Sequence, residues 1–342
     1  MPDLTKLSSY RYDLPQELIA QTPTDRRDAS RLLVVGRGDK TEADRHFSDI
    51  VEYLNAGDCL VINETKVIPA RLMGRTASGT QAEVLLLSRL EGDVWRCMTR
   101  PGKKTRVGDV VDFGRMRGVV VGTTEDGLRD VRFEYEGVFN ELLDEIGVMP
   151  LPPYIHERLE DGSRYQTVYA RTEGSAAAPT AGLHFTPELL EKLKDKGVIT
   201  ARVLLHVGIG TFRPVKCEDI TAHAMHREYI KVTQQTADTI NAARRDGGRI
   251  VCVGTTSCRV METVSDCDGV VRPFEGETGI FIYPPYRFKA TDALITNFHL
   301  PESSLLMLVC AFGGYETMMS AYAHAVENRY RFFSFGDAML IA

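Results

Sequence analysis

The sequence predicts an α/β protein in which a mostly parallel sheet domain is interrupted by an inserted small antiparallel β-barrel. Strand-like and helix-like patterns alternate over the first sixty residues and again after residue 186, which is typical of a parallel sheet covered on both faces. Between them, residues 66–137 show short β-type runs separated by Gly or Asp, as in a small antiparallel barrel. We therefore expect a discontinuous α/β catalytic domain over 1–65 and 150–342, and a barrel domain over 66–149.

The elements before residue 150 follow from hydrophobic spacing. The run Leu32-Leu-Val-Val predicts a strand, residues 47–54 have apolar positions at helical spacing, and Cys59-Leu-Val-Ile predicts a buried strand. The barrel strands are expected at 82–87, 94–98, 110–113, 118–121 and 130–135. A proline-rich segment at 149–154 then returns the chain to the first domain.

After residue 186 the alternation of helix and strand resumes. Thr186 suits an N-cap, Pro187 the first helical position and Gly197 the end of that helix. The further elements expected are strands at 198–207, 249–253 and 293–296, and helices at 233–246, 257–264 and 304–312.

Composition favours a cytoplasmic protein. In 342 residues, 43% are hydrophobic and 26% charged. No apolar run approaches the roughly 18 residues that span a bilayer, and the N-terminus lacks a signal-peptide core. Seven scattered cysteines without a Cys-x-x-Cys pair predict reduced thiols and no zinc ribbon. We expect no membrane association and a monomer.

The charge is unevenly distributed. The net charge is −6, yet residues 66–120 hold eleven Lys or Arg and five acidic residues, a balance of 11 − 5 = +6. A basic segment on an acidic body can contact a phosphate backbone, although a solvated sheet face with mixed charges explains the same pattern.

Polar motifs follow three predicted strands at the edge where ligands bind in open α/β sheets. These motifs are His206-Val-Gly-Ile-Gly-Thr-Phe, Gly254-Thr-Thr-Ser and Thr296-Asn-Phe-His299. Free N–H groups at Gly254-Thr-Thr-Ser suit an anion or ribose hydroxyls, and ordinary helix capping is the structural alternative. A fourth segment, residues 174–186, is rich in small residues and holds His184, either in a lined pocket or as a hydrogen-bonded structural histidine.

Several motifs in one order carry a resemblance that spans the chain from Tyr12-Asp-Leu-Pro to Gly336-Asp-Ala-Met-Leu. They include Arg27-Asp-Ala-Ser-Arg-Leu-Leu33, Val67-Ile-Pro-Ala-Arg-Leu72, Met149-Pro-Leu-Pro-Pro-Tyr-Ile155, Arg164-Tyr-Gln-Thr-Val-Tyr-Ala170 and Arg331-Phe-Phe-Ser-Phe-Gly-Asp337. The chain resembles the S-adenosylmethionine:tRNA ribosyltransferase-isomerase (QueA) family of queuosine biosynthesis.

The resemblance implies transfer and isomerisation of the ribosyl part of S-adenosylmethionine, used as a cosubstrate, onto 7-aminomethyl-7-deazaguanine at the tRNA wobble position. Epoxyqueuosine-tRNA, adenine and methionine are the products. This chemistry needs a base beside the sulfonium and a proton donor for adenine. The expected catalytic residues are His184, His206, His226, Glu228 and His299, with base and acid unassigned among them.

The ligand contacts expected from the motifs form two sets. For S-adenosylmethionine they are Pro179, Thr180, Gly182, Phe185, Gly208, Gly210, Thr211, Phe212, Thr255, Thr256 and Asn297. For tRNA they are Arg27, Asp28, Arg31, Arg71, Lys103, Lys104 and Arg106, with arginine on phosphate and Asp28 on a guanine-like edge.

Other functions remain open from sequence. Another S-adenosylmethionine-dependent tRNA-modifying enzyme, such as a methyltransferase, is the alternative enzyme. A non-catalytic RNA-binding module built on the basic segment is a second alternative, against which the His, Thr and Asn residues at strand ends argue. His223-x-x-His226 with Glu228 and Cys217 lacks zinc spacing, so no metal is expected.

Overall fold

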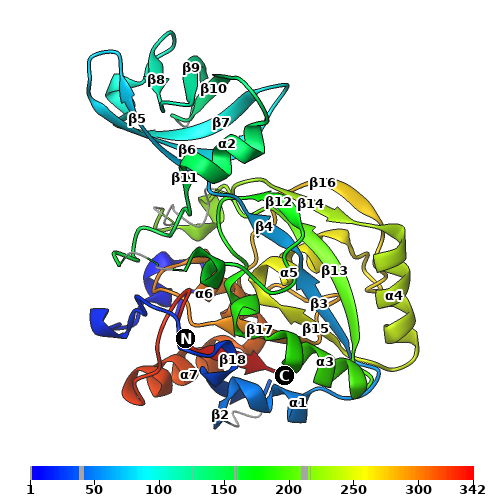
Figure 1. Ribbon diagram of the computed structural model, residues 1–342. Coiled ribbons are helices and arrows are strands. Elements are labelled where there is room, and N and C mark those ends of the chain that lie inside the picture. The colour runs from blue at the N-terminus through cyan, green and yellow to red at the C-terminus, as the bar shows by residue number, and fades with distance from the viewer. Residues whose placement is uncertain are drawn as a thin grey trace. The chain divides into compact units, whose positions relative to one another are not determined.

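The chain divides into two compact units, shown in the computed structural model of Figure 1. The structure describes residues 2–37, 42–125, 127–157, 159, 161–208, 215 and 217–342. The α/β unit comprises Met1–Glu64, Pro153–Ala170 and Pro179–Ala342, and the β-rich unit comprises Thr65–Pro152 and Arg171–Ala178. Residues 171–178 were expected in the α/β domain. They group instead with the β-rich unit, where β12 (Thr172–Ser175) pairs with β4 (Thr65–Val67).

The α/β unit is built on a nine-stranded sheet of order β16-β14-β13-β3-β15-β17-β18-β1-β2. In chain order its strands are β1 (Arg31–Val35), β2 (Glu42–His46), β3 (Cys59–Asn63), β13 (Ile199–Leu205), β14 (Glu228–Val232), β15 (Ile250–Val253), β16 (Phe274–Thr278), β17 (Ala293–Asn297) and β18 (Ala338–Ile341).

The sheet is mixed, whereas the sequence predicted a mostly parallel one. Strands β13, β3, β15 and β17 are parallel neighbours, and β18 is parallel to β1. The pairs β17–β18, β1–β2, β13–β14 and β14–β16 are antiparallel. The parallel core therefore has antiparallel strands added at its edges, as large α/β sheets often have.

Both faces of the parallel core are covered. Leu60, Ile62, Val251 and Val253 belong to a buried cluster that includes residues of the two helices on one face, α1 (Ile50–Tyr53) and α3 (Pro187–Asp195). Alternate residues of a strand point to opposite faces, so Cys252 points to the other face. There its thiol lies 3.6 Å from the Thr291 hydroxyl, which is also 3.6 Å from the thiol of Cys258 on α5 (Gly254–Val264).

The helices have local sequence causes. The Thr186 hydroxyl accepts the N–H of Leu189 at 3.1 Å and Pro187 opens α3, as expected. The helices of this unit are α1 (Ile50–Tyr53), α3 (Pro187–Asp195), α4 (Gln234–Arg245), α5 (Gly254–Val264), α6 (Ser304–Gly313) and α7 (Tyr315–Glu327). Short 3-10 turns are η1 (Leu7–Tyr10), η2 (Gln16–Leu18), η3 (Arg27–Ala29), η4 (Phe47–Asp49), η6 (Gly162–Tyr165), η7 (Thr180–His184) and η9 (Ile220–Ala222).

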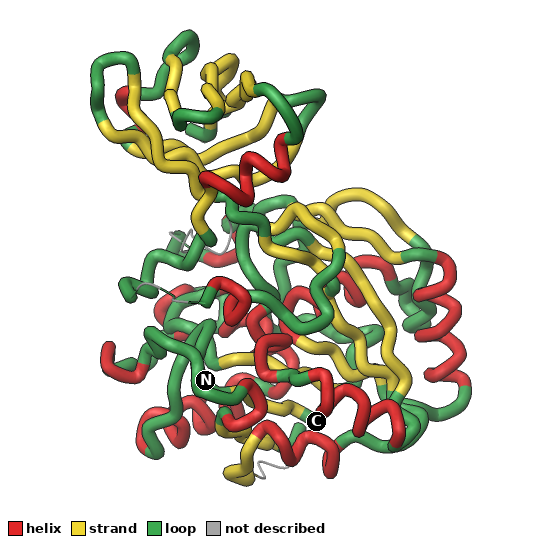
Figure 2. The backbone as a smooth tube through the Cα atoms, viewed as in Figure 1, coloured by secondary structure: helices red, strands yellow, loops and turns green. Residues whose placement is uncertain are grey.

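The β-rich unit is mostly strand (Figure 2). Its elements are β4, β5 (Arg71–Thr76), β6 (Gln81–Arg89), β7 (Val94–Arg100), η5 (Gly102–Lys104), β8 (Val110–Asp112), β9 (Met116–Thr123), β10 (Arg129–Tyr135), α2 (Phe139–Ile146), β11 (Gly147–Val148) and β12. Strands β5-β6-β7-β10-β9-β8 form an antiparallel series that the β5–β8 pairing closes. On α2, Phe139 stacks on Trp95 of β7 with ring centroids 5.5 Å apart. The expected α/β fold with an inserted closed barrel is therefore confirmed.

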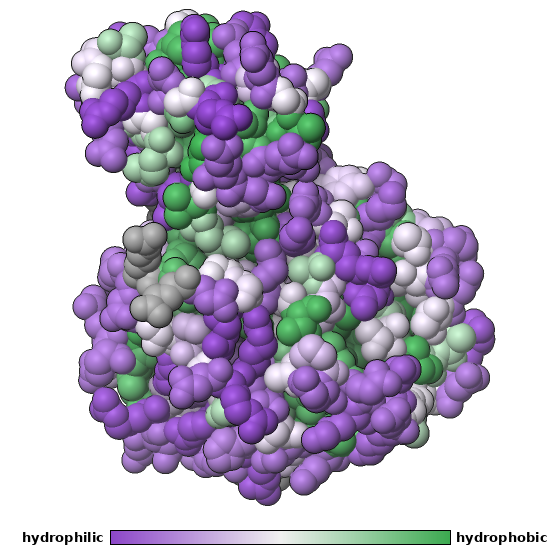
Figure 3. All heavy atoms as spheres, in the orientation of Figure 1, coloured by the Kyte–Doolittle hydropathy of each residue, from purple (hydrophilic) through white to green (hydrophobic). Residues whose placement is uncertain are grey.

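The face seen in Figure 3 is predominantly hydrophilic over the α/β unit. Within the described residues no single helix is both long and apolar enough to cross a membrane. In the part of the chain that the structure describes, one pair of helices, α6 and α7, reaches the required length and composition when taken together, with a bend of 117° between them.

Candidate functional site at the carboxyl edge of the sheet

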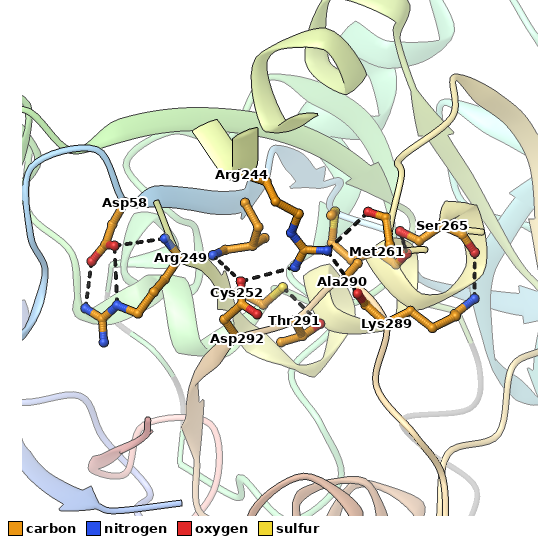
Figure 4. Close-up of polar contacts among 12 residues, drawn as sticks. Asp58, Arg244, Arg249, Cys252, Met261, Ser265, Lys289, Ala290, Thr291 and Asp292 are labelled. Atoms are coloured by element: carbon orange, nitrogen blue, oxygen red, sulfur yellow. Dashed lines mark hydrogen bonds and ion pairs between the residues drawn. The ribbon is translucent and has the colours of Figure 1, made fainter. Parts of the chain in front are cut away.

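The two edges of the parallel core differ in how their polar groups are paired. At the amino edge, Asp58 before β3 accepts from the backbone N–H of Arg249 at 3.0 Å and from its guanidinium at 2.6 Å. Asp292 before β17 pairs with Arg244 at 3.1 Å (Figure 4). At the opposite, carboxyl edge, several buried polar atoms of the described residues have no hydrogen-bond partner. Buried polar groups are almost always paired, so the carboxyl edge is the candidate ligand site.

The start of α5 carries two of these atoms. Gly254 turns the chain from β15 into α5 with φ +85°, a left-handed conformation that favours glycine. The hydroxyl oxygens of Thr256 and Ser257 are buried in the first turn without a partner among the described residues. The free N–H groups of a helix start favour an anion. Thr255, also expected to bind ligand, is buried in the same turn.

A buried ion pair lies beside this turn. Arg259 of α5 and Glu228 of β14 form a salt bridge, and their side chains are 6% and 5% exposed. Glu228 also accepts the N–H of Gly208 at 2.9 Å. One guanidinium nitrogen of Arg259, Nη2, is buried and unpartnered within the described residues. The pair thus fixes the chain at Gly208 and keeps one donor available.

His184 lies at the centre of a second hydrogen-bond network. Its Nδ1 is 2.7 Å from the Ser30 hydroxyl, and its Nε2 is 3.0 Å from the Asn297 amide nitrogen. The same amide nitrogen also faces the carbonyl of Asp337 at 3.4 Å, and the amide oxygen accepts from Thr180 at 2.9 Å. A carbonyl only accepts, so the Asn297 amide donates to Nε2 and the proton of His184 resides on Nδ1.

Burial sets the protonation of this histidine. The pKa of His184 is lowered to about 3, first by burial and then by the positive charges of Arg27 and Arg331. The ring stacks on Phe47 with centroids 4.9 Å apart. A neutral imidazole with both nitrogens engaged orients its neighbours rather than exchanging protons.

The other expected catalytic histidines lie in different surroundings. His206 follows β13, stacks on Tyr229 at 5.6 Å, and has its pKa lowered to about 4 by burial. His226 is half-buried, two residues before Glu228. The His299 ring is bound to the Thr296 hydroxyl at 2.8 Å. Since Thr296 and Asn297 point to opposite faces of β17, His299 does not join the His184 network, and burial lowers its pKa to about 3.

The segment that precedes α3 holds four residues expected to bind S-adenosylmethionine. Thr180 reaches Asn297, and Gly182 passes so close to Tyr169 that an added Cβ would lie 2.0 Å from its hydroxyl oxygen. Pro179 is buried. Phe185 is fully buried against Phe47, with ring centroids 4.9 Å apart, so it packs in the core where it has no surface to offer a ligand. Gly210, Thr211 and Phe212 lie outside the described residues.

In the α/β unit, the side chains expected to contact tRNA already make hydrogen bonds or ion pairs within the protein. Arg27 donates to the carbonyls of Leu183 at 3.1 Å and Ser163 at 2.9 Å. Arg31 pairs with Asp44 at 3.3 Å and covers the Tyr330 ring at 3.6 Å. Asp28 is buried and accepts from Arg26 through one oxygen, while its other oxygen is unpartnered in the described chain.

In the β-rich unit the expected tRNA contacts divide into two kinds. Arg71 pairs with Glu83 at 3.2 Å. Lys103, Lys104 and Arg106 are exposed around η5, and their charged groups have no carboxylate within 4.0 Å among the described residues. Among the described residues, five of the eleven cations of 66–120 form ion pairs, namely Lys66, Arg71, Arg89, Arg96 and Arg115. Three of the six others, Lys103, Lys104 and Arg106, lie together around η5.

Sequence reasoning left Ser257 and Arg259 out of the expected ligand contacts. Ser257 ends the Gly254-Thr-Thr-Ser motif and Arg259 follows two residues later, so the sequence held a signal for both. Within the described ranges, no group of three or more His, Cys, Asp or Glu side chains is placed to hold a metal ion.

Fold and geometry together define an α/β protein with an inserted β-barrel and a polar candidate site at the carboxyl edge of its parallel strands. The chain belongs to the family described as queuosine biosynthesis protein, whose model matches residues 7–341.

Three curated relatives named S-adenosylmethionine:tRNA ribosyltransferase-isomerase align over 339 residues, 98% of this chain and 99% of each relative. The protein of Symbiobacterium thermophilum is 60% identical, that of Acetivibrio thermocellus 56% and that of Clostridioides difficile 55%. The crystal structure of S-adenosylmethionine tRNA ribosyltransferase from Thermotoga maritima is 42% identical, with a TM-score of 0.57 over 98% of this chain and 100% of that one.

Proposed function

We propose that this protein is an S-adenosylmethionine:tRNA ribosyltransferase-isomerase. It transfers and isomerises the ribosyl part of S-adenosylmethionine onto 7-aminomethyl-7-deazaguanine in the tRNA anticodon and releases adenine and methionine. The observation that carries this proposal is the alignment of 98% of the chain, at 55–60% identity, with three relatives of that name.

S-adenosylmethionine is assigned to the carboxyl edge of the sheet. The unpartnered hydroxyls of Thr256 and Ser257 and the free N–H groups of α5 suit its carboxylate or ribose hydroxyls. The free nitrogen of Arg259 adds a charged donor to the same region. Thr180 and Asn297, which the His184 network orients, are placed at the end of β17 on this edge.

The histidines divide into positioning and proton-transfer roles. His184 has both ring nitrogens engaged, so it holds Asn297 and Ser30 in place. Neither His184 nor His206 is an imidazolium near neutral pH, because burial lowers their pKa values to about 3 and 4, so neither is the general acid. We assign proton acceptance to His206 and leave His226 as the candidate donor for adenine departure. Glu228 is the partner carboxylate that holds Arg259 and the backbone at Gly208 in place.

The β-rich unit is assigned to tRNA. Its exposed Lys103, Lys104 and Arg106 supply the unpaired positive charge that phosphates attract. The α/β unit is then the catalytic domain. We further propose a cytoplasmic monomer that needs no metal; the seven free cysteines agree with a reducing compartment.

A mass-spectrometric assay tests the reaction. The protein is mixed with S-adenosylmethionine and tRNA bearing the aminomethyl-deazaguanine, and the products are measured. Adenine, methionine and a heavier wobble base together support the proposal. S-adenosylhomocysteine would instead identify a methyltransferase, and tRNA binding without turnover of folded protein would favour a non-catalytic RNA-binding module.

A further inference from the structure

We propose that Arg27, Arg164 and Arg331 form a binding site for one phosphate group of the tRNA backbone, at a small depression beside His184. This inference rests on the proposed function, because it takes tRNA as the substrate. Arg27, Arg164 and His184 are among the residues that line the depression, all of the α/β unit. Arg331 lies outside this lining, close enough for its charge to act on His184.

Backbone carbonyls hold the three guanidiniums in place. Arg27 donates to Leu183 and Ser163, as described above. Arg164 donates to the carbonyls of Asp25 at 3.2 Å and Thr24 at 2.5 Å. Arg331 donates to the carbonyl of Thr22, next to the depression. Bonds to carbonyls orient a guanidinium but leave its positive charge uncancelled, so the site is organised before an anion arrives.

Within the described part of the chain, no carboxylate is in ion-pair contact with the cluster. Asp161 acts on Arg27 and Arg164, and Asp337 on Arg331, through electrostatic interactions at longer range. Among the described residues, none of the three guanidiniums has a carboxylate oxygen within 4.0 Å. The pKa of Arg27 is lowered first by burial and then by repulsion from Arg164, with Asp161 opposing this. The Nε of Arg164 is buried without an acceptor. Partly buried charge without a partner is costly, so an anion with several oxygens would relieve all three side chains.

The small volume of the depression and the neutral state of His184 favour a phosphate group that approaches from the protein surface. The depression has room for about 20 Å³, which admits an anion's oxygen but not a nucleoside. A guanidinium fork matches two phosphate oxygens, and backbone phosphates are the groups that RNA presents to a protein surface. His184 remains neutral beside the cluster, so the guanidiniums alone supply the charge.

The test compares R164Q and R331Q with the wild type and with R245Q, which removes an exposed arginine from the last turn of α4. Equilibrium tRNA binding is measured across a series of KCl concentrations, and KM is measured for each substrate. In R164Q and R331Q, tRNA affinity should fall about three- to tenfold. The slope of log K against log salt should become shallower by about 0.7–0.9. R245Q should match the wild type, and the KM for S-adenosylmethionine should not change.

R164K separates charge from folding, since it keeps the positive charge and loses the planar fork. It should keep the wild-type salt slope while binding tRNA more weakly. Folded R164Q and R331Q with wild-type affinity and slope would overturn the phosphate site. The two proposals can fail separately. If the wild-type protein releases no adenine but R164Q still binds tRNA more weakly than the wild type, the proposed reaction is overturned and the phosphate site is supported.

Discussion

The guanidinium of Arg259 on α5 forms a buried ion pair with the carboxylate of Glu228 at the first residue of β14. The carboxylate also fixes the N–H of Gly208, just past the end of β13. One pair therefore ties together α5, β14 and the segment that follows β13. All three elements meet at the candidate site.

Breaking this pair on one side should be costly. E228Q leaves Arg259 as an uncompensated buried charge, and we expect a loss of about 3–5 kcal/mol in the free energy of unfolding. The double variant E228L/R259M removes both charges and should recover most of that stability without recovering adenine release. Urea unfolding checks the first expectation and the adenine assay the second. Full activity in the stable double variant would remove the pair from the site.

The buried histidines should make the protein sensitive to acid. The folded-state pKa of His299 lies at about 3, below the unfolded value of about 6.5, so the unfolded state binds the extra proton. Stability is then full above about pH 6.5 and falls as the pH decreases toward 3. H299Q should reduce the pH dependence of the unfolding free energy by up to about 1.4 kcal/mol per pH unit. Urea unfolding at pH 7, 6 and 5 measures this, and an unchanged slope would contradict it.

The close approach of Gly182 to Tyr169 can be tested by a double-mutant cycle. G182A places a Cβ 2.0 Å from the Tyr169 hydroxyl and should destabilise by about 1–3 kcal/mol. Y169F should be nearly neutral, because that hydroxyl is buried without a partner in the described chain. The double variant should recover part of the loss through a coupling energy above about 0.5 kcal/mol. Strictly additive effects on thermal unfolding would argue against the contact.

The unpaired cations near η5 should contact RNA. Replacing Lys103, Lys104 and Arg106 by Ala should weaken tRNA binding and reduce the salt slope by up to about 2–3. The KM for S-adenosylmethionine should stay unchanged.

A matched control removes three cations of the same unit that are already paired with carboxylates. These are Arg89, Arg115 and Arg132, each at least half exposed. The control should lose much less affinity. Equal losses in the two triple variants would mean that net charge alone, and no particular surface, governs binding.

The sequence predicted those parts of the fold that local rules determine. Thr186 and Pro187 fixed the start of α3, and the closely spaced strands of 66–137 indicated the barrel. The antiparallel edges of the sheet were missed because strand direction depends on pairing between distant segments. For example, β17 pairs with β18, about forty residues later in the chain.

The sequence predicted that the motifs after β13, β15 and β17 would lie at one edge of the sheet. The described parts of these motifs do follow strands that end together, because the three strands are joined by parallel pairings. Whether this edge binds a ligand stays a prediction. The sequence could not show that His184 and His299 belong to different hydrogen-bond networks. The difference depends on which face of β17 each ring contacts: His184 bonds to Asn297 and His299 to Thr296. Phe185 was expected to contact S-adenosylmethionine, whereas in the structure it packs against Phe47. This packing could not be predicted because the two residues are far apart in the sequence.

The position of β18 constrains how the chain acquires its structure during synthesis. Residues 338–341 lie between β17 and β1, so one of the earliest strands made pairs with one of the last. Until residues 338–341 have been made, β1 has no β18 to join, and its main-chain groups on that side lack their native partners. Completion of the sheet therefore depends on pairing between strands that lie about 300 residues apart in the chain, and pairing over such a long sequence separation slows folding.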